Sequence, residues 1–129
     1  MVVEERKTDI VIIDDEWCIR EVLDMLLEET YKMRLCESAE AALAIPKDEA
    51  AGVRVLFLDG YLGRGCMTGD EALPELIEHF PRARIVYIGA LGEYKAEGLL
   101  ECGVHVMLPK PWDVEDIKAA AAEGMAWSA

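Results

Sequence analysis

Four side chains that could do chemistry follow short apolar segments of the chain. Asp14 and Asp15 come directly after one such segment, and Asp59 comes directly after a second. Lys110 follows a third. If these segments are neighbouring strands, three carboxylates and one ammonium group meet, and the repelling carboxylates must either take up a proton or admit a cation. A hard divalent cation with oxygen ligands, Mg²⁺, is the expected occupant, and Lys110 would face an anion beside it.

A carboxylate, Mg²⁺ and a lysine in one place indicate phosphoryl chemistry, with Asp59 as the nucleophile. Taken singly, each of these residues has a commoner role. An aspartate at a strand end usually forms a turn or caps a helix, as Asp15 could, and a lone lysine is usually solvated. The prediction therefore depends on the combination of residues at three segment ends.

Apolar and amphipathic segments alternate along the chain. Continuous apolar runs predict strands buried on both faces, over residues 10–13, 33–36, 53–59, 84–88 and 104–108. Apolar residues at helical spacing predict helices over residues 16–30, 39–45, 69–80, 92–102 and 114–125. This alternation predicts an α/β domain in which a doubly wound parallel five-stranded sheet carries helices on both faces. In such sheets ligands bind beyond the carboxyl ends of the strands, where the acids and the lysine fall.

The composition limits the class of protein. The chain has 129 residues, which suits one domain, and 26 acidic against 13 basic residues give it a net charge of −13. This charge argues against a nucleic-acid or membrane surface as partner, since both require basic side chains. No apolar run approaches the length of a membrane span, and the N-terminus has no signal-peptide core. We therefore expect a cytoplasmic protein.

The cysteines are too widely spaced for a CxxC pair or a zinc site. Two of them lie in apolar segments, so we expect buried, free thiols in a reducing compartment. The four cysteines are Cys18, Cys36, Cys66 and Cys102.

Together these features resemble the receiver domain of two-component response regulators. The matching pieces are the acidic pair Asp14-Asp15, Asp59 after an apolar strand, and Lys110-Pro111 after the fifth strand. The resemblance covers residues 8 to about 126. It implies a flavodoxin-like (βα)₅ fold with strand order 2-1-3-4-5, and a single receiver domain over residues 1–129 without an output domain.

The resemblance also implies a function in phosphorelay signalling. Asp59 would accept a phosphoryl group from the phosphohistidine of a histidine kinase or of a histidine phosphotransfer protein. Such a chain is a phosphoacceptor, with at most self-catalysed phosphoryl transfer and autodephosphorylation, rather than an enzyme. A separate downstream protein would carry the output, and the sequence leaves open whether the chain forms a homodimer.

The family also implies roles for individual residues around Asp59. Mg²⁺ would be held by Asp15, Asp59 and the backbone carbonyl of Tyr61, with Asp14 contributing through water. Lys110 would pair with the phosphoryl group. The bond between Lys110 and Pro111, a structural proline, is expected to be cis.

Two positions and one loop depart from the family's pattern. The hydroxyl residue that normally ends the fourth strand is Gly89, followed by Ala90, and the aromatic residue of the fifth strand is Met107. An enlarged glycine-rich loop also follows Asp59. Without the hydroxyl, the backbone N–H groups of Gly89 and Ala90 would bind the phosphoryl group, and we expect an atypical switch.

Two alternatives remain open at this point. The chain could be a degenerate receiver that docks proteins without being phosphorylated. The segment 55–60 also resembles the opening of haloacid-dehalogenase-like phosphatases, but these need a second acid two residues after the nucleophile, where this chain has Tyr61. Dinucleotide binding is disfavoured because the turn after the first strand has no glycines.

Overall fold

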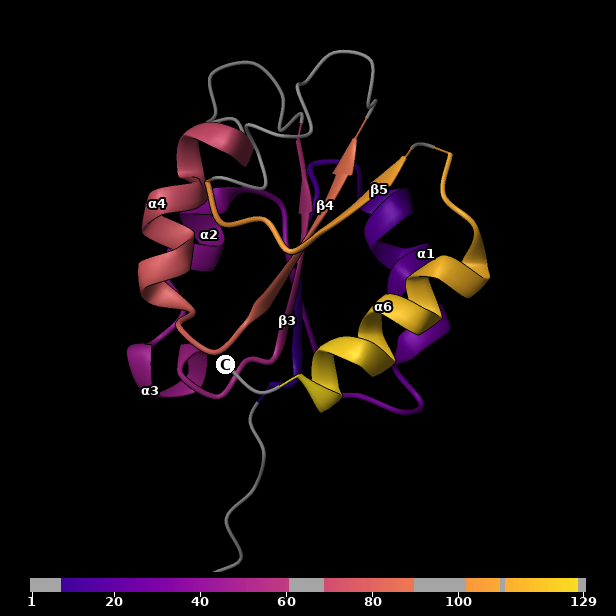
Figure 1. The fold of residues 1–129 in the computed structure, drawn as a ribbon, viewed down its shortest axis with the longest axis horizontal. Helices are drawn as coiled ribbons and strands as arrows, with labels where there is room; N and C mark the ends of the chain where they lie inside the picture. The colour runs from indigo at the N-terminus through magenta and orange to yellow at the C-terminus, as the bar shows by residue number, and fades with distance from the viewer. Residues whose placement is uncertain (1–7, 61–68, 90–101, 110, 128–129) are drawn as a thin grey trace, which may run out of the picture.

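Five parallel strands form one sheet in the order β2-β1-β3-β4-β5 (Figure 1). The structure, a computed structural model, describes residues 8–60, 69–89, 102–109 and 111–127, with the backbone alone for residues 69–71. The strands are β1 (Ile10–Ile13), β2 (Met33–Cys36), β3 (Val55–Asp59), β4 (Arg84–Gly89) and β5 (Val106–Pro109). This confirms the flavodoxin-like (βα)₅ fold class and the strand order that the receiver resemblance implied.

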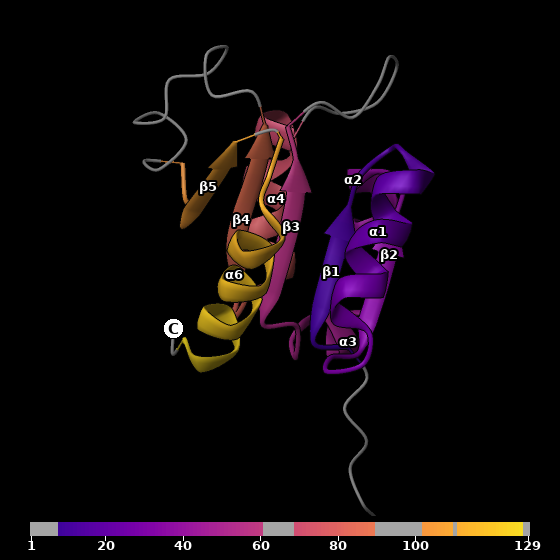
Figure 2. The same cartoon turned by 90° about the vertical axis from the view of Figure 1, so that its right-hand side faces the viewer.

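Helices cover both faces of this sheet. They are α1 (Trp17–Leu27), α2 (Ala39–Leu43), α3 (Lys47–Ala50), α4 (Gly69–His79) and α6 (Val114–Ala126). Helices α2 and α4 lie on one face, and α1 and α6 lie on the other (Figure 1). The arrows of β1, β3 and β4 end at the same edge of the sheet (Figure 2). Residues that follow these strands therefore share one edge of the molecule.

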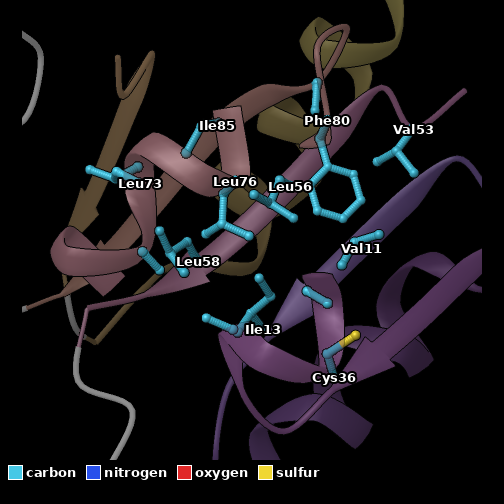
Figure 3. Packing of buried hydrophobic residues seen from close by; sticks show 14 of the residues in the cluster. Val11, Ile13, Cys36, Val53, Leu56, Leu58, Leu73, Leu76, Phe80 and Ile85 are labelled. Carbon is cyan, nitrogen blue, oxygen red and sulfur yellow. The ribbon is translucent and has the colours of Figure 1, made fainter. Parts of the chain in front are cut away.

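Both faces of the central strands are buried, which explains their continuous apolar runs. We call the cluster beneath α2 and α4 the α4-side core, and Figure 3 shows part of it. It includes Val11, Ile13, Leu56, Leu58, Ile85 and Tyr87 from the strands, with Leu73, Leu76 and Phe80 from and after α4. On the other face lie Ile10, Ile12, Val55, Phe57, Val86 and Ile88, packed with Leu23, Leu27, Ile117, Ala120 and Ala121. Alternate residues of one strand thus stabilise opposite layers.

Helix α1 is shorter than the sequence suggests. It ends at Leu27, whereas the apolar periodicity predicted a helix to residue 30. The N–H groups of Thr30 and Tyr31 both donate to the carbonyl of Leu27, at 3.1 and 2.9 Å. One carbonyl thus closes the last turn, and the chain then turns into β2.

A short helix that the sequence did not predict, α3, follows Pro46 directly. The proline was expected to end the preceding helix, and α2 does end before it, at Leu43. A proline is also tolerated where a helix starts, because the N–H that it lacks has no partner there. The N–H of Val53 donates to the carbonyl of Ala50 at 3.2 Å and closes the turn after α3. Strand β3 accordingly begins at Val55, later than predicted.

The other differences lie towards the far edge of the sheet. Strand β4 extends to Gly89, one residue further than predicted, and β5 begins at Val106, two residues later. The helix predicted over residues 92–102 falls almost entirely outside the described residues.

Helix α6 makes a close approach to the sheet at Gly124. A Cβ atom at this position would lie 2.3 Å from Cγ2 of Val55, a side chain that is stiff at χ1. Gly124→Ala gains about 1 kcal/mol of helix propensity but overpacks the core at a cost of about 1–3 kcal/mol. We therefore expect the free energy of unfolding, measured in urea, to fall by up to about 2 kcal/mol.

Gly52 provides the matched control for this substitution. A Cβ atom there would meet only the carbonyl oxygen of Glu49, at 3.6 Å, so Gly52→Ala should keep or slightly raise the stability. Equal effects of the two substitutions would contradict the close packing of α6 on β3.

Candidate functional site

The ends of β1 and β3 bring three carboxylates together. The two strands are neighbours, and Ile13 pairs with Leu58, so the residues that follow stand side by side. Carboxylate oxygens of Asp14, Asp15 and Asp59 all lie within 4.8 Å of one another. We call these three residues the acidic cluster. The convergence of these three acids was predicted for neighbouring strands, and the pairing of β1 with β3 produces it.

Asp14 is the most firmly held member of the cluster. Its side chain is 3% exposed, and its Oδ1 accepts a hydrogen bond from the N–H of Glu16 at 2.9 Å. Its own N–H donates to the carbonyl of Cys36 at 3.0 Å, and its carbonyl accepts from Nη1 of Arg20 at 2.6 Å. The backbone and carboxylate are therefore both fixed, by β2 on one side and by α1 on the other.

The other two acids differ in exposure. Asp59 is buried, with 3% of its surface exposed, whereas Asp15 is exposed. Two buried carboxylates and one exposed carboxylate at this separation repel one another. Oxygen donors of this kind and number suit a hard divalent cation such as Mg²⁺. The donor set thus fits the metal predicted from the sequence, and the exposed Asp15 leaves the cluster open to solvent.

Some predicted site residues cannot be placed. Tyr61, Ala90 and Lys110 lie outside the described residues, and so does the bond between Lys110 and Pro111. Gly89 is described: it is buried at the end of β4 and pairs with Pro109 of β5.

Met107 of β5 is half-buried and packs against the α4-side core. In the sheet it pairs with Tyr87 of β4. A flexible thioether side chain therefore lies next to a tyrosine on the neighbouring strand.

The expectation of buried thiols is wrong for Cys18. This residue lies in α1 but is exposed, because the buried face of the helix passes through Leu23 and Leu27 instead. Cys36 is buried as expected, and burial raises the pKa of its thiol, which keeps it protonated and unreactive. Cys102 is exposed.

Two residues near the cluster were not singled out from the sequence. Arg20 reaches back from α1 to the carbonyl of Asp14, and the only sequence signal for it is a cation one to two helical turns after the acids. Tyr87 is fully buried in β4, with its ring end close to Gly60. An apolar strand that contains one tyrosine gives no sign of where the hydroxyl points.

The chain is similar to known proteins over most of its length. The family model of the response regulator receiver domain matches residues 10–122. The chain belongs to the response regulator receiver family. Proteins of this family are phosphoacceptors that act in phosphorelay signalling with a histidine kinase or a phosphotransfer protein, and they generally bind Mg²⁺ through a cluster of aspartates.

Solved structures agree with this assignment. The receiver domain of NtrX from Brucella abortus is 27% identical, with a TM-score of 0.81 over 93% of this chain and 100% of that chain. A response regulator receiver domain protein from Clostridium thermocellum is 21% identical, with a TM-score of 0.80 over 92% of this chain and 94% of that chain. The chemotaxis protein CheY4 of Vibrio cholerae is 21% identical, with a TM-score of 0.73 over 90% of this chain and 97% of that chain, and these last two show the fold alone. No curated protein is significantly similar in sequence.

The helices of this receiver are short. Among the described residues, none has both the length and the apolar character needed to cross a membrane.

Proposed function

We propose that this receiver accepts a phosphoryl group on Asp59 from a phosphohistidine, with Mg²⁺ held by Asp14, Asp15 and Asp59. The observation that carries the proposal is the acidic cluster, whose carboxylate oxygens lie within 4.8 Å of one another at the shared edge of β1 and β3. Phosphoryl transfer requires a nucleophile and positive charge in one place, and this cluster provides the nucleophile and attracts the cation.

In the proposed step, a carboxylate oxygen of Asp59 attacks phosphorus while the phosphorus–nitrogen bond of phosphohistidine breaks. A divalent ion on the cluster would neutralise the charge on the phosphoryl oxygens. Asp14 is held in place by the N–H of Glu16 and by Arg20, so its carboxylate needs little reorganisation. The exposed Asp15 leaves the cluster accessible to the donor.

The remaining parts of the site stay predictions. The carbonyl of Tyr61 would complete the ligand set of Mg²⁺, and Lys110 would pair with the phosphoryl group. The backbone N–H groups of Gly89 and Ala90 would bind phosphoryl oxygens in place of a hydroxyl. We also propose that the protein works in the cytoplasm.

The mass of the intact protein tests this proposal. With a small phosphodonor such as acetyl phosphate, Mg²⁺ should allow the addition of one phosphoryl group, and a chelator should prevent it. A protein that gains no mass under these conditions would favour the alternative of a docking module that works without phosphorylation. An equal mass gain in chelator would instead contradict the role proposed for Mg²⁺.

Gly89 supports a second proposal, that phosphorylation changes the shape of this receiver less than usual. A hydrogen bond between a hydroxyl and a charged group contributes about 1.5–3 kcal/mol, and Gly89 cannot make one through a side chain. Moving an equilibrium between two conformations from 1:99 to 99:1 takes about 5.5 kcal/mol. The loss of this hydrogen bond therefore removes much of the free energy that would drive a conformational switch. Met107 can change rotamer without the swing of a bulky ring. Retention and transfer of the phosphoryl group are therefore favoured over a large conformational change.

Hydrogen exchange across residues 89–111 tests this second proposal. We expect small changes in protection when beryllofluoride and Mg²⁺ are added as a phosphoryl mimic. Wide changes through residues 91–103 would show that a switch operates by another route.

A further inference from the structure

Tyr87 fills the space beside the residue that follows Asp59. Its side chain is fully buried in the α4-side core, and its ring ends at Gly60. A Cβ atom on Gly60 would lie 2.0 Å from Oη of Tyr87, 2.5 Å from Cζ and 2.9 Å from Cε1. These separations are far below van der Waals contact, so the tyrosine ring occupies the place that a side chain at position 60 would need.

The same ring also lies against the end of β4. A Cβ atom on Gly89 would be 3.1 Å from Cε1 of Tyr87, which is tighter than ordinary contact. The N–H of Gly60 donates to the carbonyl of Ile88 at 3.0 Å. The backbone just after Asp59 is thus held by a hydrogen bond to β4 and by the packed ring of Tyr87, which also belongs to β4.

We infer that Tyr87 is a positioning residue for the acidic cluster, because it fixes the Asp59–Gly60 corner and hence the direction of the Asp59 carboxylate. This inference rests on the proposed function. Mg²⁺ demands near-ideal octahedral geometry, and a bound ion tolerates displacements of only about 0.5 Å in its ligands. A fully buried ring cannot swing aside without disturbing the core around it. The two glycines and the tyrosine therefore act as one packing unit beneath the acceptor.

The alternative is that Tyr87 only fills the core, as Phe80 does. Among the described residues, Phe80 is the other large aromatic side chain of the α4-side core, and in Figure 3 its ring lies on the side of Leu56 away from Leu58, which is next to Asp59 in β3. Phe80→Leu and Tyr87→Leu remove similar ring atoms from one core. Any difference in Mg²⁺ affinity between the two variants therefore reflects where the lost ring lay relative to Asp59, rather than the loss of packing itself.

Mg²⁺ titration of the full chain, without phosphodonor, separates the two roles. We expect Tyr87→Leu and Gly60→Ala each to weaken Mg²⁺ binding about tenfold, the lower end of the loss seen when the residues that support metal ligands are changed. Phe80→Leu should lower the melting temperature but keep the wild-type Kd. The double variant Gly60→Ala with Tyr87→Leu should bind Mg²⁺ more tightly than Gly60→Ala alone, because leucine lacks the hydroxyl oxygen and the two ring carbons that the new Cβ meets.

Tyr87→Phe provides a second check that keeps the core filled. Phenylalanine retains Cζ and Cε1, so it should not rescue Gly60→Ala. A wild-type Kd in folded Gly60→Ala would overturn the inference, and so would equal losses in Phe80→Leu and Tyr87→Leu. A wild-type protein that does not bind Mg²⁺ would instead overturn the proposed function itself.

Discussion

Asp59→Asn should reduce phosphorylation by a histidine kinase to background while the protein remains folded. Asparagine has nearly the shape of aspartate but no carboxylate oxygen that can attack phosphorus. Removal of a catalytic nucleophile typically costs several orders of magnitude in rate. Electrophoresis in a gel that retards phosphoproteins would show the loss as the absence of a shifted band.

Asp113→Asn is the matched control for this substitution. Asp113 caps α6 by accepting a hydrogen bond from the N–H of Glu115 at 3.0 Å, and asparagine caps helices equally well. The same chemical change at this position should leave phosphorylation at the wild-type rate. A shifted band of wild-type intensity in Asp59→Asn would rule out Asp59 as the acceptor.

Asp14→Asn should stabilise the protein without metal and weaken its response to Mg²⁺. Three carboxylates whose oxygens lie within 4.8 Å of one another repel, and two of them are buried. The amide oxygen of asparagine can still accept the hydrogen bond from the N–H of Glu16. Removing one charge should therefore raise the free energy of unfolding in chelator by on the order of 1–3 kcal/mol.

The same substitution removes part of the attraction for a cation, since affinity depends on the charge of the ligand set. In chelator the variant should have the higher melting temperature. In Mg²⁺ the order of the two proteins should reverse, because the wild type gains more stability from the ion. Asp15→Ala should also abolish the gain from Mg²⁺. If Asp14→Asn is less stable in chelator and gains as much from Mg²⁺ as the wild type, the cluster is not the metal site.

Much of the fold could be predicted because buried strands have a recognisable pattern of apolar residues in the sequence. Continuous apolar runs such as Ile10–Ile13 are typical of strands that are covered on both faces, and they alternate with helical spacing along the chain. The carboxyl ends of parallel strands meet at one edge, and the receiver resemblance implied that the first and third strands are neighbours, so Asp14 and Asp59 were expected to lie together.

The features that the sequence did not reveal depend on contacts between distant residues. Helix α3 follows Pro46 and has only four residues, which is too short for an apolar periodicity to appear in the sequence. Cys18 is exposed because the rotation of α1 is set by Leu23 and Leu27 against the sheet. The close approach of Tyr87 in β4 to Gly60 after β3 joins residues far apart in the sequence, and neither residue alone indicates it.

Chemical trapping of the acceptor tests the central claim most directly. The wild-type protein would be phosphorylated with Mg²⁺ present, reduced with borohydride and digested, because borohydride converts an aspartyl phosphate to homoserine. Peptide sequencing by mass spectrometry should then find homoserine at position 59, and only after phosphorylation in the presence of Mg²⁺. Homoserine at position 14 or 15 in place of 59, or no homoserine in fully phosphorylated protein, would contradict the assignment of Asp59 as the phosphoacceptor.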